Sequence, residues 1–336
     1  MIKEAISLLI EGRDLSKVQM ADSMRDIMEG KSTDAQTASF LTALRLKGET
    51  IDEITGAAVI MREKATKINS PLNTVDTCGT GGDMAHTFNI STTSAIVVSA
   101  CGVPVAKHGN RSVSSRSGSA DVLEALGVKI DLEPKKVERC LQETGFGFMF
   151  APLFHPAMKF AIGPRKEMGI RTVFNILGPL TNPAGAKRQV LGVFSDPLTE
   201  TMAHVLCNLG IEHAFIVHGK DGLDEITNTD DTKISELKNG TVNTYYLSPS
   251  DIGFKKAGKD ELVGGTAEEN AKITMDILKG LTGAKRDITI MNSAAALIAG
   301  GHANGFFGAV KQAEEAIDSG AALRKLEEII AITNKL

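Results

Sequence analysis

The sequence predicts an α/β protein in which a small N-terminal helical domain precedes a larger domain, built on a central, mostly parallel sheet flanked by helices. Within residues 2–64, apolar side chains recur every three or four positions, as in Ile6, Leu9 and Ile10, which is typical of amphipathic helices. From residue 74 onward, short apolar runs typical of strands alternate with helical patterns, and this alternation favours a parallel sheet. The chain has 336 residues, which is more than a domain with a single hydrophobic core usually contains, and this favours two domains.

The boundary between the domains is predicted in a polar segment, residues 64–74, which contains Asn69 and Pro71. We therefore assign residues 1–68 to the helical domain and residues 69–336 to the α/β domain. Strands are expected at 74–78, 103–106, 190–194 and 214–217, with helices at 120–126, at 197–209 and through most of 267–332.

The charge balance sets 37 lysines and arginines against 41 acidic residues, a formal net charge of −4. Such a chain has no overall basic field to hold a nucleic acid, so any phosphate binding must be local. Its apolar stretches are interrupted well before the ~20 residues that a membrane span needs, and the N-terminus has no signal-peptide pattern. We therefore expect neither a nucleic-acid nor a membrane partner.

Four cysteines, Cys78, Cys101, Cys140 and Cys207, lie far apart and form no C-x-x-C pair. This spacing argues against a zinc site and against a disulfide framework. A reducing, cytoplasmic location is therefore expected.

A glycine-rich segment, Gly79-Thr80-Gly81-Gly82-Asp83, directly follows the first predicted strand of the α/β domain. Three glycines in five positions let backbone N–H groups turn toward a bound anion without obstruction by side chains. A tight loop that needs positive φ explains the same pattern, so the segment alone leaves both interpretations open.

The segment Asn89-Ile90-Ser91-Thr92 begins a helical run that extends to Ala100. An open helix N-terminus presents N–H donors and the positive end of the helix dipole to phosphate, which strengthens the anion-binding interpretation of the glycine-rich segment. Ser91 and Thr92 can instead cap the helix, which is the commoner role of such residues. The residues alone do not distinguish a cap from a metal ligand at Ser91.

A basic, serine-rich segment, residues 107–119, follows the predicted strand at 103–106. It holds three cations and five serines in thirteen residues and contains no acid, which is unusual for a solvated loop. Ligands of parallel sheets usually sit at strand ends. The donors of this segment suffice for a pyrophosphate and a ribose phosphate.

Two adjacent carboxylates, Asp224 and Glu225, follow the predicted strand at 214–217. Carboxylates at a strand end can hold Mg²⁺ through oxygen while substrate phosphates complete the coordination shell. An acidic surface turn is the alternative for an isolated pair. Opposite a phosphate-binding loop, the metal site is favoured.

A cationic segment, residues 163–171, leads into the apolar segment 172–180. Its Arg165 suits bidentate binding of a carboxylate beside an apolar wall. A surface salt bridge is the alternative for this arginine, and His155 upstream is of a type that is more often structural than catalytic.

These motifs resemble those of the anthranilate phosphoribosyltransferases, a family related to the pyrimidine nucleoside phosphorylases. The resemblance covers essentially the whole chain and begins in the helical domain at residues 39–50. The segments 79–83 and 107–119 are shared with the phosphorylases, whereas residues 165–183 and the carboxylate pair favour the transferase.

The resemblance implies transfer of the 5-phosphoribosyl group of phosphoribosyl pyrophosphate (PRPP) to the amine of anthranilate in tryptophan biosynthesis, with two Mg²⁺ ions per subunit. It also implies a homodimer formed through the helical domains. Helices from about residues 163–187 are expected to be part of each helical domain. One departure from the family pattern is Thr266, where an acidic residue is expected after Gly264-Gly265. It lies outside the catalytic motifs.

The resemblance also assigns roles to individual residues. The catalytic roles fall to Lys107, His108 and Arg165. The implied PRPP site comprises Gly79, Gly82, Asp83, Thr87, Asn89, Ile90, Ser91, Thr92, Lys107, His108, Gly109, Asn110, Arg111, Ser112, Val113, Ser114, Ser115 and Ser119. The implied anthranilate site comprises Gly79, His108, Asn110, His155, Arg165 and Pro179, and the implied Mg²⁺ ligands are Ser91, Asp224 and Glu225.

Two other functions compete with this interpretation. A pyrimidine nucleoside phosphorylase would use inorganic phosphate as its nucleophile and would not need the metal carboxylates. A noncatalytic relative would bind nucleic acid through the basic loops, which the net charge of −4 and the intact carboxylate pair disfavour.

Overall fold

The computed structural model describes residues 1–83, 85–112 and 116–336. Within these residues the α/β domain contains one seven-stranded sheet with the order β3-β2-β1-β4-β5-β6-β7. Neighbours among β1 to β5 pair in parallel, and β6 and β7 are added in antiparallel orientation, so the predicted mostly parallel sheet is confirmed. The strands are β1 Val75–Gly79, β2 Val105–Gly109, β3 Phe146–Phe150, β4 Arg188–Gly192, β5 His213–Gly219, β6 Thr232–Lys238 and β7 Thr241–Leu247.

The four expected strands correspond to β1, β2, β4 and β5, whereas β3 and the β6–β7 hairpin were not predicted. The hairpin has a sequence signal of its own, because Asn239-Gly240 occupies left-handed backbone positions, with φ of 50° and 82°, between two alternating strands. Strand β3, Phe146–Phe150, carries no comparable signal, because a continuous apolar run after a helix is equally compatible with more helix.

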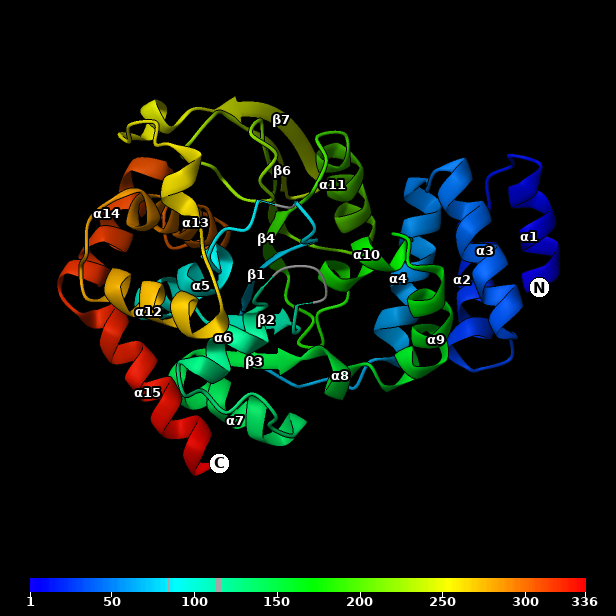
Figure 1. Cartoon of the computed structure of the whole chain (residues 1–336), viewed down its shortest axis with the longest axis horizontal. Coiled ribbons are helices and arrows are strands. Elements are labelled where there is room, and N and C mark those ends of the chain that lie inside the picture. Colours follow the sequence, from blue (N-terminus) through cyan, green and yellow to red (C-terminus); the bar gives the residue numbers. More distant parts are fainter. Residues whose placement is uncertain (84, 113–115) are drawn as a thin grey trace.

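The N-terminal domain is a helical bundle, on the right of Figure 1. It comprises α1 Ile2–Ile10, α2 Lys17–Met28, α3 Asp34–Lys47 and α4 Ile51–Lys64. The N-cap residues of α2, α3 and α4 are Ser16, Thr33 and Thr50. Each of these side chains accepts a hydrogen bond from the third backbone N–H of its helix in a capping box. A helix from much later in the sequence, α9 Lys159–Met168, packs against α2 and α3 (Figure 1).

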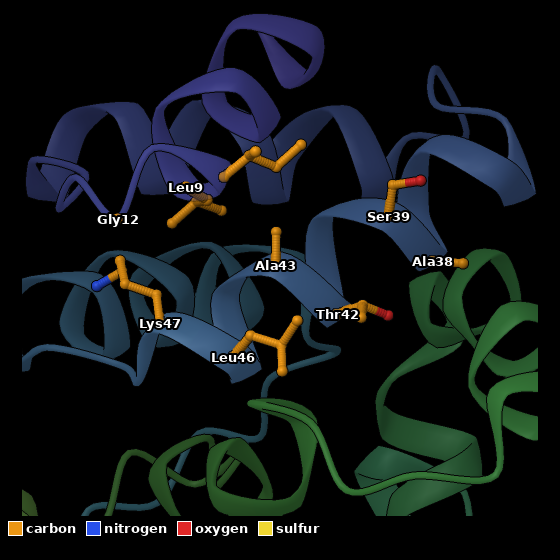
Figure 2. A pocket seen from close by; sticks show the side chains of 9 residues that line it. Leu9, Gly12, Ala38, Ser39, Thr42, Ala43, Leu46 and Lys47 are labelled. Carbon is orange, nitrogen blue, oxygen red and sulfur yellow. The ribbon is translucent and has the colours of Figure 1, made fainter.

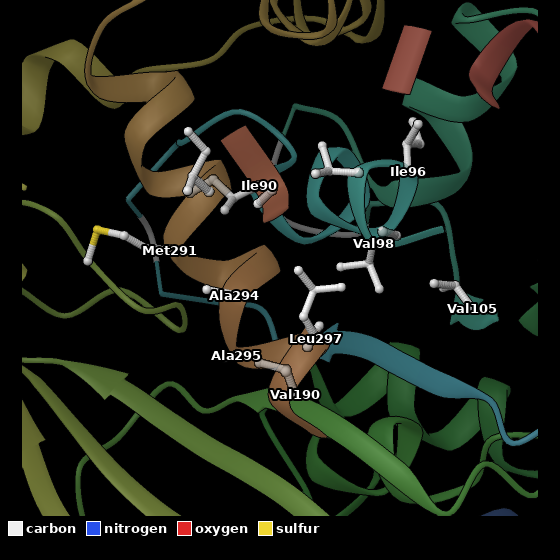
Figure 3. Close-up of a cluster of buried hydrophobic side chains, with 14 of the residues drawn as sticks. Ile90, Ile96, Val98, Val105, Val190, Met291, Ala294, Ala295 and Leu297 are labelled. Atoms are coloured by element: carbon white, nitrogen blue, oxygen red, sulfur yellow. The ribbon is translucent and has the colours of Figure 1, made fainter. Parts of the chain in front are cut away.

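Three apolar clusters among the described residues pack against the sheet, and two of them are large. One lies between the sheet and the helices α5 and α13, with Ile90, Val98, Val190 and Leu297 among its buried side chains (Figure 3). The other joins the opposite face of the sheet, through α11, to the N-terminal bundle. Burial of each such aliphatic side chain contributes roughly 1.5–3 kcal/mol, so the cores fix the strand ends described below.

The remaining helices are α5 Ile90–Ala100, α6 Ser119–Ala125, α7 Pro134–Thr144, α8 Ala151–Phe154, α10 Phe174–Leu177, α11 Leu198–Asn208, α12 Ala267–Leu278, α13 Ala284–Ala299, α14 Phe306–Asp318 and α15 Ala321–Lys335. In the described part of the chain, every helix is too short or too polar to pass through a bilayer.

Candidate active site

The predicted motifs meet at the carboxyl edge of the parallel strands. β1 leads into the glycine-rich segment 79–83, its neighbour β2 ends in residues 107–109, and β5 leads into the loop that carries Asp224 and Glu225. The carboxyl ends of parallel strands lie at the same edge of a sheet, where such folds bind ligands. Three segments that are far apart in the sequence therefore form one site.

Asp224 packs directly against the backbones of two strands. A Cβ atom at Gly192 would collide with the Asp224 carbonyl oxygen, so only glycine fits there, and one at Gly79 would displace the Asp224 carboxylate from its position. The Gly81 N–H donates to Asp224 Oδ2 at 2.8 Å. Gly81 and Gly82 also have positive φ, of 65° and 78°, so the tight-loop interpretation of this segment is correct and is compatible with anion binding.

The carboxylates at this edge repel one another. Partial burial, followed by the charge of Asp83, raises the pKa of Asp224 to about 7. Burial, followed by the charge of Asp224, raises the pKa of Glu225 well above its ordinary value, while Lys107 opposes that shift. Concentrated negative charge of this kind favours the binding of a cation.

Lys107 supplies a cation between the strand β1 and the start of α5. Its side chain is 1% exposed, and its Nζ donates to the Thr77 carbonyl and, at 3.4 Å, to Ser91 Oγ. Burial lowers the pKa of Lys107, and the charges of Asp76 and Glu225 act in the opposite direction. The ammonium group therefore lies beside both the carboxylates and the helix terminus.

The N-terminus of α5 carries no side-chain cap. Asn89 occupies the N-cap position but makes no capping hydrogen bond, and its Nδ2 donates to the Ser117 carbonyl at 3.2 Å. The Ser91 N–H donates to Glu225 Oε1 at 3.2 Å. Thr92 Oγ1 is buried and has no hydrogen-bond partner among the described residues. Ser91 and Thr92 therefore do not serve as caps.

Two other residues of the implied PRPP site make contacts within the fold. Ile90 belongs to the apolar core, and its N–H donates to the Phe88 carbonyl at 2.8 Å. Thr87 forms an isolated antiparallel bridge with Val263.

The described residues on either side of positions 113–115 contact α6 or belong to it. Ser119 Oγ donates to the Asn110 carbonyl at 3.3 Å and lies against Gly109, where a Cβ would collide with it. The Ser112 N–H donates to Asp121 Oδ2 at 3.1 Å. Arg111 pairs with Asp121 and Glu124, each at 2.8 Å, and is therefore directed toward α6. The predicted PRPP contacts Val113, Ser114 and Ser115 lie outside the described residues.

A pair of imidazoles lies on the other side of β2. His108 and His155 approach each other with 3.2 Å between their Nε2 atoms, and His108 also hydrogen-bonds the backbone of Gly178, next to Pro179. Burial lowers the pKa of His108 to about 3 and the pKa of His155 to about 4, so both rings are neutral at pH 7.

Arg165 lies on α9 with its guanidinium 4.9 Å from the centre of the Phe174 ring. Burial lowers its pKa, and no acidic side chain among the described residues offsets that shift. The surface salt bridge considered for this arginine is therefore not formed in the described part of the chain. The guanidinium stays available for a carboxylate beside an aromatic wall.

Two contacts at the site involve residues to which the sequence assigned no role. The Arg171 guanidinium donates to the Gly82 carbonyl and lies 4.8 Å from the centre of the Phe194 ring, so it ties the segment after α9 to the glycine-rich loop.

Asp76, fully buried in β1, accepts hydrogen bonds from the His108 N–H at 3.3 Å and from Asn182 Nδ2 at 2.7 Å. An aspartate inside an otherwise buried strand was the available signal for that network.

The buried imidazoles predict a pH dependence of stability. The pKa values of His108 and His155 in the folded chain lie below the ordinary value of 6.5. Between about pH 6.5 and pH 4, therefore, these two side chains take up protons only when the chain is unfolded. The free energy of unfolding falls as the pH falls through this range. We expect His155→Gln to flatten this dependence by roughly 1.4 kcal/mol per pH unit. Urea unfolding at pH 7, 6 and 5 measures it. The exposed His204 gives the control His204→Gln, and equal slopes for the two variants would contradict the assignment.

The chain matches a known protein family and known relatives along almost its whole length. Models described as the helical bundle domain and the a/b domain of a glycosyl transferase family match residues 3–65 and 72–323. The chain is 58% identical over 335 residues, 99% of its length and 97% of the relative's, to an anthranilate phosphoribosyltransferase of Acetivibrio thermocellus.

Solved structures agree with the sequence comparison. The chain superposes on anthranilate phosphoribosyltransferase from Thermus thermophilus with a TM-score of 0.93 at 41% identity, covering 98% of this chain and 99% of the other. For the Saccharomyces cerevisiae enzyme, in complex with PRPP and Mg, the TM-score is 0.92 at 30% identity, covering 100% and 98%.

The fold and the site define a glycosyl transferase built from a helical bundle and an α/β domain. Within that class, the chain belongs to the anthranilate phosphoribosyltransferase family. The resemblance identified from the sequence motifs is thereby confirmed.

Proposed function

We propose that this protein transfers the 5-phosphoribosyl group of PRPP to the amine of anthranilate, giving N-(5-phosphoribosyl)anthranilate and pyrophosphate in tryptophan biosynthesis. The observation that carries the proposal is the convergence of the glycine-rich loop, Lys107 and the carboxylates of Asp224 and Glu225 at one sheet edge, in a chain of this family. The carboxylate pair distinguishes the transferase from a phosphorylase, which would not need it.

The carboxylates fit a magnesium site. Asp224 and Glu225 are hard oxygen donors whose raised pKa values reflect burial and mutual repulsion, which a divalent cation would relieve. No three acidic, histidine or cysteine side chains among the described residues converge as a complete metal site. This agrees with the usual coordination of Mg²⁺ in proteins, in which one or two carboxylates bind the ion and water and substrate phosphates provide the remaining ligands.

We assign the ligand roles to Ser91, Asp224 and Glu225, with two ions per subunit. The Saccharomyces cerevisiae relative in complex with PRPP and Mg supports the choice of metal. When bound, Mg²⁺ supplies positive charge that neutralises the departing pyrophosphate. The chain's own part is to hold these oxygens at the sheet edge, which Gly81 N–H and Ser91 N–H do for Asp224 and Glu225.

PRPP is held, in this proposal, by the loop 79–83, the open N-terminus of α5 and the segment after β2. The uncapped helix end and the unpartnered Thr92 hydroxyl present donors suited to a diphosphate. Lys107 adds a buried cation where negative charge grows as the bond from C1 to pyrophosphate breaks. Arg171 holds the loop in place through the Gly82 carbonyl.

Anthranilate binds, in this proposal, near Asn110, Arg165 and the two imidazoles. Arg165 takes the carboxylate, with the Phe174 ring beside it. His108 and His155 are neutral at pH 7 and do not repel the guanidinium. The arylamine is itself neutral at pH 7, so orienting it toward C1 matters more than removing a proton beforehand. We expect direct displacement with inversion at C1.

The experiment that tests the function compares the two related chemistries in parallel. With PRPP and Mg²⁺ supplied, the protein should consume anthranilate, followed by the loss of its fluorescence. With inorganic phosphate and a pyrimidine nucleoside, it should release no free base. Release of base without consumption of anthranilate would establish the phosphorylase instead, and a salt-sensitive gel shift would support the nucleic-acid binder.

We further propose that the chain forms a homodimer through its helical domain, residues 1–68 with the helices from about 163–187. An open groove of about 630 Å³ lies on α1 and α3. Leu9, Ala43 and Leu46 are among its lining residues (Figure 2). Two of the lining side chains, Ile10 and Leu46, are 73% and 83% exposed. Apolar side chains gathered in this way favour a protein interface.

Four unpaired thiols also support the expected cytoplasmic location.

The dimer predicts the effect of a charge in this groove. Leu46→Glu should shift the protein toward the mass of one chain, because an interface would have to bury the new carboxylate without a partner. Sedimentation velocity measures the change. Leu281→Glu, at a 61% exposed leucine between α12 and α13, is the matched control and should keep the mass of the parent protein. A parent protein that already sediments as one chain would contradict the dimer.

A further inference from the structure

A buried amide on α12 contacts the start of α5 from behind the site. Asn270 is 1% exposed, and its Nδ2 donates to Asn89 Oδ1 at 3.0 Å. Its Oδ1 accepts the Gly265 N–H at 2.8 Å, and because that N–H can only donate, it fixes which end of the amide faces Asn89. The Asn270 amide group therefore has one allowed orientation.

The contact draws the Asn89 side chain away from its own helix. Asn89 Oδ1 also accepts from Ser117 Oγ at 3.3 Å, and Asn89 Nδ2 donates to the Ser117 carbonyl at 3.2 Å. Both polar atoms of the side chain are thus engaged outside α5, although asparagine at an N-cap ordinarily accepts from the second or third N–H of the helix. The Ser91 N–H of the first turn donates to Glu225, so the backbone donor that this arrangement leaves without a side-chain cap is the Thr92 N–H.

The backbone around Asn270 is held equally firmly. Gly264 N–H donates to the His86 carbonyl at 2.9 Å, and a Cβ at Gly264 would lie 2.6 Å from the Phe88 nitrogen. Thr266, the departure from the family pattern, caps α12 by accepting from the Glu269 N–H. Threonine and aspartate are both good N-caps, so the departure leaves the position of Asn270 intact.

We propose that Asn270 is a positioning residue for PRPP binding, which keeps the Asn89 side chain from capping α5 and so leaves the Thr92 N–H of its first turn available for the diphosphate. The inference rests on the proposed function. Without the amide donor, Asn89 Oδ1 can turn to the Thr92 N–H and compete there with the substrate.

A matched residue separates this role from mere packing. Thr274 lies one turn further along α12, is equally buried at 1% exposure, and its Oγ1 is 2.9 Å from Oγ1 of Thr93 on α5. Thr274→Val removes a buried hydrogen bond between the same two helices without touching Asn89. Its thermal midpoint gives the cost of losing one buried hydrogen bond here. Asn270→Asp keeps an acceptor for Gly265 and loses the donor to Asn89, and because it also buries a carboxylate it should be less stable than Thr274→Val.

The experiment measures KM for both substrates and the thermal midpoint of Asn270→Ala, Asn270→Asp and Thr274→Val. We expect the Asn270 variants to raise KM for PRPP about tenfold, the equivalent of one net hydrogen bond, with KM for anthranilate unchanged. Thr274→Val should leave both KM values near those of the parent. If Asn270→Ala does not fold, Asn270→Asp carries the test. A KM for PRPP that moves no further than in Thr274→Val would overturn the proposal.

A double-mutant cycle tests the route of the effect. If Asn270 acts through Asn89, then adding Asn270→Asp to Asn89→Ala should raise KM for PRPP by much less than Asn270→Asp alone, because no side chain remains to cap the helix. Additive effects would show that Asn270 acts by another route. Parent protein that consumes anthranilate with PRPP validates the proposed function independently of either result.

Discussion

Arg165→Ala is expected to raise KM for anthranilate by roughly a hundredfold, the equivalent of about 3 kcal/mol for a charge-assisted hydrogen bond, while KM for PRPP changes little. The physical reason is that the Arg165 guanidinium lies against Phe174 with no acidic partner among the described residues, and is therefore available for the aryl carboxylate. Initial rates with each substrate varied at saturation of the other measure the effect.

Two further variants sharpen the Arg165 prediction. Arg165→Lys keeps the charge but not the planar fork, so it should recover only part of the affinity for anthranilate. Lys166→Ala removes the neighbouring exposed cation and should leave both KM values unchanged. Equal increases in KM for the two substrates in Arg165→Ala would remove the arginine from its assigned role.

Asp224→Asn combined with Glu225→Gln is expected to lower kcat/KM for PRPP by about a thousandfold, as when a group that stabilises developing charge is lost. Each amide keeps an oxygen that can accept the N–H of Gly81 or Ser91, so the fold should survive. The thermal midpoint without metal should be equal or higher, because the substitutions remove repulsion among Asp83, Asp224 and Glu225. A magnesium titration of the rate should become flat.

The control for the carboxylate variant is a second pair of adjacent acids. Asp230 and Asp231 lie on the surface, where both pair with the exposed Lys256. Asp230→Asn combined with Asp231→Asn should leave the magnesium titration unchanged. If instead the Asp224/Glu225 variant titrates like the parent, the metal assignment is wrong.

The sequence predicted those parts of the fold that local pattern encodes. The buried apolar runs of β1, β2, β4 and β5 and the periodicity of α1 to α4 are visible within short windows, and the glycine-rich segment and carboxylate pair were found by residue type. The antiparallel hairpin at Asn239-Gly240 was also encoded locally, and its turn signal would have predicted it.

The contacts across the site could not be predicted in the same way. Arg171 contacts Gly82, 89 residues away in the sequence, and Asn270 contacts Asn89, 181 residues away. Neither contact can be predicted from a local sequence pattern. The ion pairs of Arg111 were not anticipated either. Its type and position predict a phosphate ligand, which stays a prediction, and the fold adds pairs with Asp121 and Glu124 of α6, each at 2.8 Å.

The most direct test of the proposed chemistry is the stoichiometry of one reaction. Purified protein with PRPP, Mg²⁺ and limiting anthranilate should release one pyrophosphate for each anthranilate whose fluorescence is lost, and chelation of the metal should stop both signals together. Anthranilate that stays intact under saturating PRPP and metal, or pyrophosphate released without it, would contradict the account.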